Sequence, residues 1–117
     1  MNDMHLGAVE SRFADIIWAN QPISTQELTR RCEQELQWKR TTTYPVLKRL
    51  SERGLFRNDG GQVTALVSRE EFYARRSQQF VEESFGGSLP AFLAAFAARK
   101  PLTEDEVAEI RRLIEEV

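Results

Sequence analysis

A turn signal near the middle of the chain constrains the fold more than any other feature. Asp59-Gly60-Gly61 separates two runs of β-favouring residues, 55–58 and 62–67. Glycine adopts the positive φ angles of a tight hairpin turn at little cost, so the pattern predicts a strand, a turn and a second strand. The residues before this hairpin follow a helical period instead, and the order of elements therefore becomes informative.

Two helical patterns come first. Residues 6–19 repeat apolar side chains at three- and four-residue steps, which predicts a helix whose buried stripe consists of Leu6, Val9, Phe13, Ile16 and Ile17. Ser24 and Glu27 then stand in the S-x-x-E spacing of a capping box. We expect a second helix to start there, to run to about residue 35 and to bury Leu28 and Cys32.

The third predicted helix contains a proline. We place this helix over residues 42–53, with Thr41 as its N-cap and Gly54 as its left-handed end. Pro45 then lies early in the helix, where it removes only the first hydrogen bond. A start at Pro45 itself is the competing register, because proline is favoured at the first helical position. Successive 100° steps give this helix a buried face that consists of Thr43, Val46, Leu47 and Leu50.

Three helices followed by a hairpin are the order of a winged helix-turn-helix, here residues 1–68. Behind it, Ser68 and Thr103 open S/T-x-x-E boxes and Ser88 is a further N-cap, so three more helices are predicted. The predicted fold is mainly α with a small β-hairpin wing. Residues 69–117 form its C-terminal helical region.

The positive charge is concentrated on the predicted helix-turn-helix. Residues 36–58 hold six basic side chains and one acidic one, whereas residues 69–117 hold seven basic and ten acidic ones. In a DNA-binding protein of this type, the helix-turn-helix contacts the DNA, and basic side chains there neutralise the phosphates. A solvated basic face is the plainer interpretation of a charge cluster, but its coincidence with this fold favours double-stranded DNA as the partner.

The outward face of the third helix is the surface expected to enter a major groove. Thr and Tyr hydroxyls can bond phosphates or base edges, a Pro ring can touch a thymine methyl, and cationic side chains give charge-assisted contacts. For Tyr44, packing on its own helix is the alternative. The predicted DNA-binding residues are Lys39, Arg40, Thr41, Thr42, Tyr44, Pro45, Lys48, Arg49 and Arg57.

The C-terminal region is apolar but short. Fewer than about 50 residues rarely close a core without metals, disulfides or a partner, so we expect residues 69–117 to pair with a second copy of the chain. Packing of these helices on their own winged helix is the alternative. A two-fold dimer would also present two reading helices to DNA. The predicted dimerisation residues are Phe80, Phe85, Leu89, Phe92, Leu93, Phe96, Val107, Ile110 and Ile114.

Three segments carry a family resemblance: residues 10–18 (ESRFADIIW), 38–54 (WKRTTTYPVLKRLSERG) and 85–92 (FGGSLPAF). They are similar to the penicillinase-repressor (BlaI/MecI/CopY) family of winged-helix transcriptional regulators. The resemblance implies a homodimeric repressor that binds a palindromic operator through the major groove and is released by a signal acting on the dimer. A sensor protease or another signal protein is then a further partner. Pro45 departs from the family, which more often has a residue such as Thr there.

Two alternatives to this interpretation stay open. PadR-like winged-helix regulators also show a Tyr-Pro pair before a Leu-x-x-Leu helix. A winged-helix protein-interaction module without DNA binding is the other alternative, and Pro45 and Glu52 on the outward face would suit it.

The residue inventory argues against an enzyme. One His and one Cys are too few for a four-ligand zinc site or an internal disulfide, and no nucleophile–base pattern or phosphate loop is present. We therefore expect no catalytic residue, metal or cofactor, and interpret Cys32 as a core residue rather than a reactive thiol. The sequence has no membrane-length apolar run and no signal-peptide layout, so we expect a cytoplasmic protein without membrane insertion.

Overall fold

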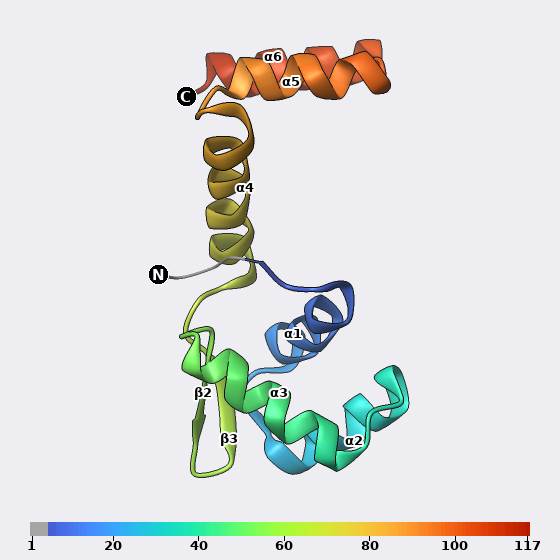
Figure 1. The fold of residues 1–117 in the computed structure, drawn as a ribbon, viewed down its shortest axis with the longest axis vertical. Coiled ribbons are helices and arrows are strands. Elements are labelled where there is room, and N and C mark those ends of the chain that lie inside the picture. Colours follow the sequence, from blue (N-terminus) through green and yellow to red (C-terminus); the bar gives the residue numbers. More distant parts are fainter. Residues whose placement is uncertain (1–4) are drawn as a thin grey trace. The chain divides into compact units, whose positions relative to one another are not determined.

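The computed structural model describes residues 5–117, and backbone contacts divide the chain into two compact units. The first unit ends at Ser77, and the second runs from Gln78 to Val117. The elements, shown in Figure 1, are α1 (Ala8–Asn20), β1 (Ile23–Ser24), α2 (Thr25–Leu36), α3 (Arg40–Glu52), β2 (Phe56–Asp59), β3 (Gln62–Ala65), α4 (Arg69–Phe85), α5 (Leu89–Arg99) and α6 (Glu104–Glu115). This order confirms the predicted winged helix followed by further helices.

The predicted hairpin forms between β2 and β3, and we call these two strands the wing. They are antiparallel, with Phe56 opposite Ala65. Gly60 and Gly61 make the turn at φ angles of 62° and 91°, the positive pair that a type I′ turn requires. The structure adds β1 on the other edge of β3, giving the order β1-β3-β2. β1 was not predicted from the sequence because its two residues are too few to show alternation.

The wing is hydrogen-bonded to the helical part at both of its ends. At the turn, the Thr25 N–H at the start of α2 donates to the Gly61 carbonyl at 2.9 Å. At the far end, the Ala65 N–H donates to Gln21 Oε1 at 2.8 Å. Between these two bonds Ile23 of β1 pairs with Val63 of β3, and both side chains are buried. The wing is thus tied to α2 and to the segment that precedes it.

The core of the first unit draws on its helices and on the wing. Its largest fully buried side chains include Phe13 of α1, Leu28 of α2, Leu50 of α3, Phe56 of β2 and Phe72 of α4. The Phe72 ring lies 5.6 Å from the ring of Trp18, and the Trp18 indole N–H donates to the Val67 carbonyl at 2.9 Å. Full burial of such a side chain contributes roughly 1.5–3 kcal/mol. The contacts of Trp18 hold the start of α4 and the segment before it on α1.

The first two helices follow the predictions with two corrections. Leu6 is buried as predicted, but it lies before the start of α1. Within α1 the buried stripe begins at Phe13, and Val9 is 46% exposed. In α2, Leu28 and Cys32 are buried as predicted. Ser24 caps α2 by accepting the Glu27 N–H at 3.0 Å. The Glu27 carboxylate, however, pairs with arginines of its own helix, so only half of the predicted capping box forms.

The predicted start of the third helix was wrong. Lys39 is the N-cap of α3 and Arg40 is its first residue, so neither an N-cap at Thr41 nor a start at Pro45 is correct. The Lys39 carbonyl accepts the N–H groups of Thr42 at 2.9 Å and Thr43 at 3.1 Å, which draws both residues into the first turn.

This earlier start places Pro45 inside α3. Proline has no N–H, so the Thr41 carbonyl loses the donor four residues ahead, and an interior proline costs a helix about 3 kcal/mol. Thr41 and Pro45 are both exposed, and water can therefore hydrate the carbonyl. At the other end, Gly54 has a φ of 82°, as a left-handed helix end requires.

The second unit contains the end of α4 with α5 and α6. Ser88 caps α5 through the Ala91 N–H at 3.1 Å, and Thr103 and Glu106 form the reciprocal capping box predicted for α6. The rings of Phe80, Phe85 and Phe92 contact one another at centroid distances of 5.9, 6.1 and 5.6 Å. Nevertheless, neither α5 nor α6 contains a buried residue.

Candidate nucleic-acid interface

The two faces of α3 separate as the sequence period predicts. Thr43, Val46, Leu47 and Leu50 are its buried residues. Trp38, just before the helix, stacks on Phe13 with a centroid distance of 5.4 Å and fixes the turn between α2 and α3. The remaining residues of α3 are consequently held in a defined orientation towards solvent.

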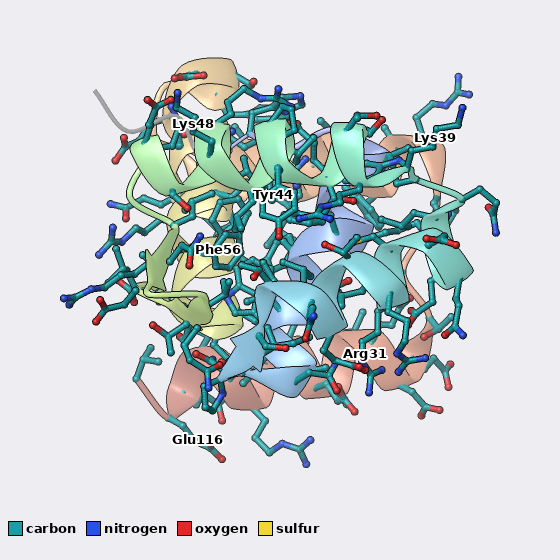
Figure 2. All side chains as sticks on the ribbon, turned by 90° about the horizontal axis from the view of Figure 1, so that it is seen from below. Arg31, Lys39, Tyr44, Lys48, Phe56 and Glu116 are labelled. Carbon is teal, nitrogen blue, oxygen red and sulfur yellow. The ribbon has the colours of Figure 1, made fainter. Side chains whose placement is uncertain are left out.

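The outward face of α3 carries cations along its length. Exposed side chains belong to Lys39, Arg40, Thr41, Thr42, Pro45, Lys48 and Arg49. Figure 2 shows Lys39 and Lys48 towards opposite ends of this helix, with Tyr44 between them. Among the residues that the structure describes, no acidic side chain forms an ion pair with Lys39, Arg40 or Lys48. These three charges remain available to an anionic partner.

Tyr44 is half-buried and packs against α2 rather than only on its own helix. Interaction with the Thr25 hydroxyl of α2, followed by the charge of the Arg40 guanidinium and the Thr29 hydroxyl, lowers the pKa of Tyr44. The Arg40 guanidinium also lies 5.4 Å from the centre of the Tyr44 ring. The ring is therefore held in place beside the outward face, with one polar edge turned towards α2.

Arg49 differs from Lys39, Arg40 and Lys48 because it has an acidic partner. Its Nη2 lies 2.7 Å from Glu10 Oε2 of α1, although the Arg49 side chain is still 55% exposed. Glu10 was not singled out in the sequence, since 39 positions separate it from Arg49 and no local pattern connects them. Nearby, the Arg53 side chain donates to the His5 carbonyl at 2.8 Å.

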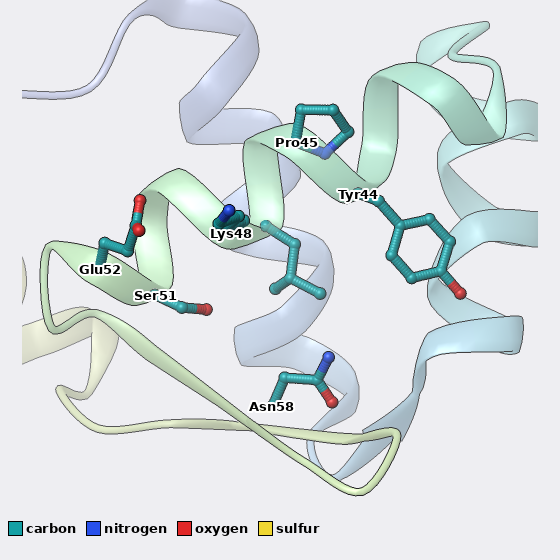
Figure 3. Close-up of a pocket in the computed structure, with 7 residues that line it drawn as sticks. Tyr44, Pro45, Lys48, Ser51, Glu52 and Asn58 are labelled. Carbon is teal, nitrogen blue, oxygen red and sulfur yellow. The ribbon is translucent and has the colours of Figure 1, made fainter.

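An open groove runs between α3 and the wing; we call it the α3–wing groove (Figure 3). Its volume is about 790 Å³. In Figure 3, Asn58 extends from the wing towards α3, and its Oδ1 also accepts the Gly61 N–H at 3.1 Å. Ser51 Oγ is buried without a hydrogen-bond partner. The lining residues are Tyr44, Pro45, Leu47, Lys48, Ser51, Glu52 and Asn58.

The sequence analysis had not singled out Ser51 and Asn58. Their contribution depends on how the wing folds back beside α3, which no local spacing encodes. Arg57, the predicted DNA contact on the wing, is exposed and forms an ion pair with Asp59 of the same strand. Its Nη2 lies 3.7 Å from Asp59 Oδ2. Arg57 is thus on the wing but does not line the groove.

Cys32 lies in the core and not at this surface. It is fully buried, and burial raises the pKa of its thiol to about 11, so it is unreactive as a thiolate at neutral pH. Within residues 5–117, no group of three or more His, Cys, Asp or Glu side chains is placed to bind a metal ion.

Among the helices that lie within residues 5–117, none combines the length and the apolar character that crossing a membrane requires.

The predicted dimerisation residues lie in the second unit and are incompletely covered. Phe80, Leu89, Phe96, Val107 and Ile114 are exposed, and Phe85, Phe92, Leu93 and Ile110 are half-buried. Leu113, which the sequence analysis left out, is 62% exposed. Along α6 an apolar hollow of about 230 Å³ is lined by residues that include Val107, Ile110 and Ile114. Apolar surface of this kind is typical of protein–protein interfaces.

Comparison with known proteins agrees with this arrangement. The family model described as penicillinase repressor matches residues 6–116. The methicillin resistance regulatory protein MecI of Staphylococcus aureus is 21% identical over 113 residues, which cover 93% of this chain and 92% of the relative. The penicillinase repressor of Bacillus licheniformis is 24% identical over 105 residues, which cover 86% of this chain and 82% of the relative.

The names of these relatives are those of a regulatory protein and a repressor, which confirms the prediction of a regulator rather than an enzyme. The family match also includes α3, the wing and the C-terminal helices. This chain belongs to the penicillinase repressor family.

Proposed function

We propose that this chain is a homodimeric transcriptional repressor that binds a palindromic operator. In this proposal residues 1–68 are the DNA-binding domain and residues 69–117 the dimerisation region. The observation that carries it is the outward face of α3, where the exposed cations Lys39, Arg40 and Lys48 have no ion-pair partner among the described residues. A signal that acts on the dimer, from a sensor protease or another signal protein, would release the operator.

DNA is the partner that fits this face. The major groove of B-DNA is about 12 Å wide and admits an α-helix, whose polar side chains then meet base edges and phosphates. Thr41 and Thr42 are exposed in the first turn of α3, where a recognition helix makes most of its base contacts. Arg57 on the wing supplies a further exposed cation. One acidic residue, Glu52, shares the outward face, and the cations outnumber it.

A salt titration tests DNA binding. We expect the logarithm of the association constant to fall linearly with the logarithm of the salt concentration, as counterion release requires. Lys48→Ala removes one phosphate contact from each protomer and should make that slope shallower by roughly 1.8 for the dimer, without changing the melting temperature. Lys100→Ala is the matched control, since Lys100 is exposed outside α3 and the wing. A protein that binds no duplex at low salt would instead be a protein-interaction module.

The dimer explains how a small module reaches useful affinity. Joining two modules makes the second DNA contact intramolecular, so a signal that separates the protomers weakens operator binding. Two copies of the second unit would also cover Phe96, Val107 and Ile114, which one copy leaves exposed. A C2 pair fits a palindrome, with half-site centres about one helical turn apart or a multiple of it.

Sedimentation of charge-inserted variants tests the dimer. Phe96→Asp and Ile110→Asp should yield monomers that lose specific DNA binding while the winged helix stays folded. Leu66→Asp is the matched control, because Leu66 is 55% exposed but lies in the first unit, and it should leave the dimer intact. Unaltered operator affinity in a proven monomer would refute the link between dimerisation and binding.

A further inference from the structure

Pro45 occupies a position where it weakens the helix and gains no burial. It lies inside α3 and removes the hydrogen-bond donor that the Thr41 carbonyl would otherwise accept from. Its ring is exposed, so no core contact offsets the lost bond. Residues that break a local rule without a packing gain are concentrated at functional sites. A role of Pro45 that compensates for the lost hydrogen bond therefore involves the outward face of α3.

The surroundings of Pro45 favour an apolar contact. The proline ring presents only C–H groups, and it lines the α3–wing groove together with Tyr44 and Leu47. Figure 3 shows Pro45 and Tyr44 as neighbours on α3. The Arg40 guanidinium lies 5.4 Å from the centre of the Tyr44 ring. Exposed Lys39, Arg40 and Lys48 on the same helix complement a polyanion, which identifies duplex DNA as the occupant.

We propose that Pro45 contacts the 5-methyl group of a thymine in the major groove and is a specificity-determining residue of α3. The inference rests on the proposed function and adds the base that this position selects. Thymine is the one standard base with an apolar group on its major-groove edge; the other bases offer donors and acceptors there. A proline side chain has neither a hydrogen-bond donor nor an acceptor. At that edge it can therefore make an apolar contact with a methyl group, but it cannot hydrogen-bond the donors and acceptors of the other bases.

Replacing thymine with uracil tests the contact, because uracil lacks only the methyl group. A preferred duplex is first selected with the full-length chain from a pool of random sequences. Thymines in that duplex are then replaced by deoxyuridine, one symmetry-related pair at a time, and the dissociation constant is measured by fluorescence anisotropy. At one pair we expect wild type to bind roughly fifteenfold more weakly, since two methyl groups are lost and burial of each is worth about fourfold.

The variant Pro45→Ala assigns the effect to the residue. It should bind the thymine and uracil duplexes with equal affinity, because the ring that touches the methyl is gone. Pro101→Ala is the matched control: Pro101 is exposed and lies outside α3 and the wing, so the wild-type preference for thymine should persist. Pro45→Ser provides a second test of the same prediction should Pro45→Ala fail to fold.

The outcomes separate this inference from the proposed function. If uracil is tolerated at every position, or if the Pro45 variants keep the preference for thymine, specific DNA binding stands and the thymine contact is overturned. If no sequence is enriched from the pool, the operator-binding function fails and the inference fails with it.

Discussion

Arg49 of α3 and Glu10 of α1 form an ion pair, with Arg49 Nη2 2.7 Å from Glu10 Oε2. The other carboxylate oxygen of Glu10 accepts the Gly7 N–H at 3.1 Å, so a single side chain serves both the start of α1 and a predicted DNA contact. The Arg49 guanidinium, followed by the Gly7 N–H, lowers the pKa of Glu10. The pair is therefore charged at neutral pH and reduces the positive charge that Arg49 presents to a phosphate.

Substituting Glu10 should strengthen electrostatic DNA binding. Glu10→Gln keeps an oxygen for the Gly7 N–H but removes the negative charge beside Arg49. The slope of log K against log salt for the dimer should therefore become steeper by up to roughly 1.8, from one Arg49 in each protomer. Glu109→Gln, at an exposed position of α6, makes the same change in net charge and should leave the slope unchanged. Equal slopes for both variants would show that Glu10 does not modulate Arg49.

The same ion pair should make stability depend on pH in acid. The pKa of Glu10 is lowered in the folded state from its usual value of 4.5, so its stabilising effect is complete above that value and is lost as the pH falls through the folded-state pKa. Urea unfolding of wild type and Glu10→Gln at pH 7, 5, 4 and 3 measures this. Wild type should be the more stable at pH 7, and the difference should shrink below about pH 4.5. An undiminished difference at pH 3 would contradict this interpretation.

Gln37 is a site where a substitution should stabilise the fold. It ends α2 in the left-handed region at a φ of 56°, which a side chain tolerates poorly and glycine tolerates well. Gln37→Gly should raise the free energy of unfolding by about 0.5–1 kcal/mol, measured by urea denaturation. Gln37→Ala keeps the strained φ and loses the exposed bond from Gln37 Nε2 to the Gln34 carbonyl, so it should give no gain. A glycine variant no more stable than the alanine variant would exclude strain at this position.

The thiol of Cys32 should report unfolding. It is fully buried and its pKa is raised to about 11 by burial, so a thiol reagent at pH 8 should leave the native protein unlabelled. In urea the reagent should label one thiol per chain, since Cys32 is the single cysteine. The rate in the absence of denaturant should follow the rate of opening. Labelling of the native state at the rate of a free cysteine would mean that the face of α2 that carries Cys32 is exposed to solvent.

The helix α3 shows which properties the sequence alone could predict. The spacing of Thr43, Val46, Leu47 and Leu50 identified its buried face, because periodicity reports directly which side of a helix meets the core. Its start was wrong because capping preferences favour a hydroxyl such as Thr41, whereas the chain turns at Lys39 and buries Thr43 to 1% exposure. Tertiary packing determines where α3 begins, and local residue preferences do not report tertiary packing.

The missed features share a dependence on tertiary arrangement. Glu10 reaches Arg49 only because α1 lies beside α3, and β1 exists only because Ile23 meets Val63. The α3–wing groove likewise requires Asn58 to be carried towards α3 by the fold of the wing. The sequence predicted the outward cations one by one. It could not show that Arg49 is paired with a carboxylate of another helix.

The bonds from Thr25 to Gly61 and from Ala65 to Gln21 have a consequence for the thermodynamics of association. A loop that is anchored only at its strand ends loses conformational entropy when a ligand immobilises it, and that loss subtracts from affinity. Here the Gly-Gly turn is attached to the first residue of α2 by a backbone hydrogen bond of the fold itself. Arg57 therefore lies on a wing that is already ordered. The conformational entropy of the wing is lost during folding, so its ordering does not subtract from the affinity for a duplex.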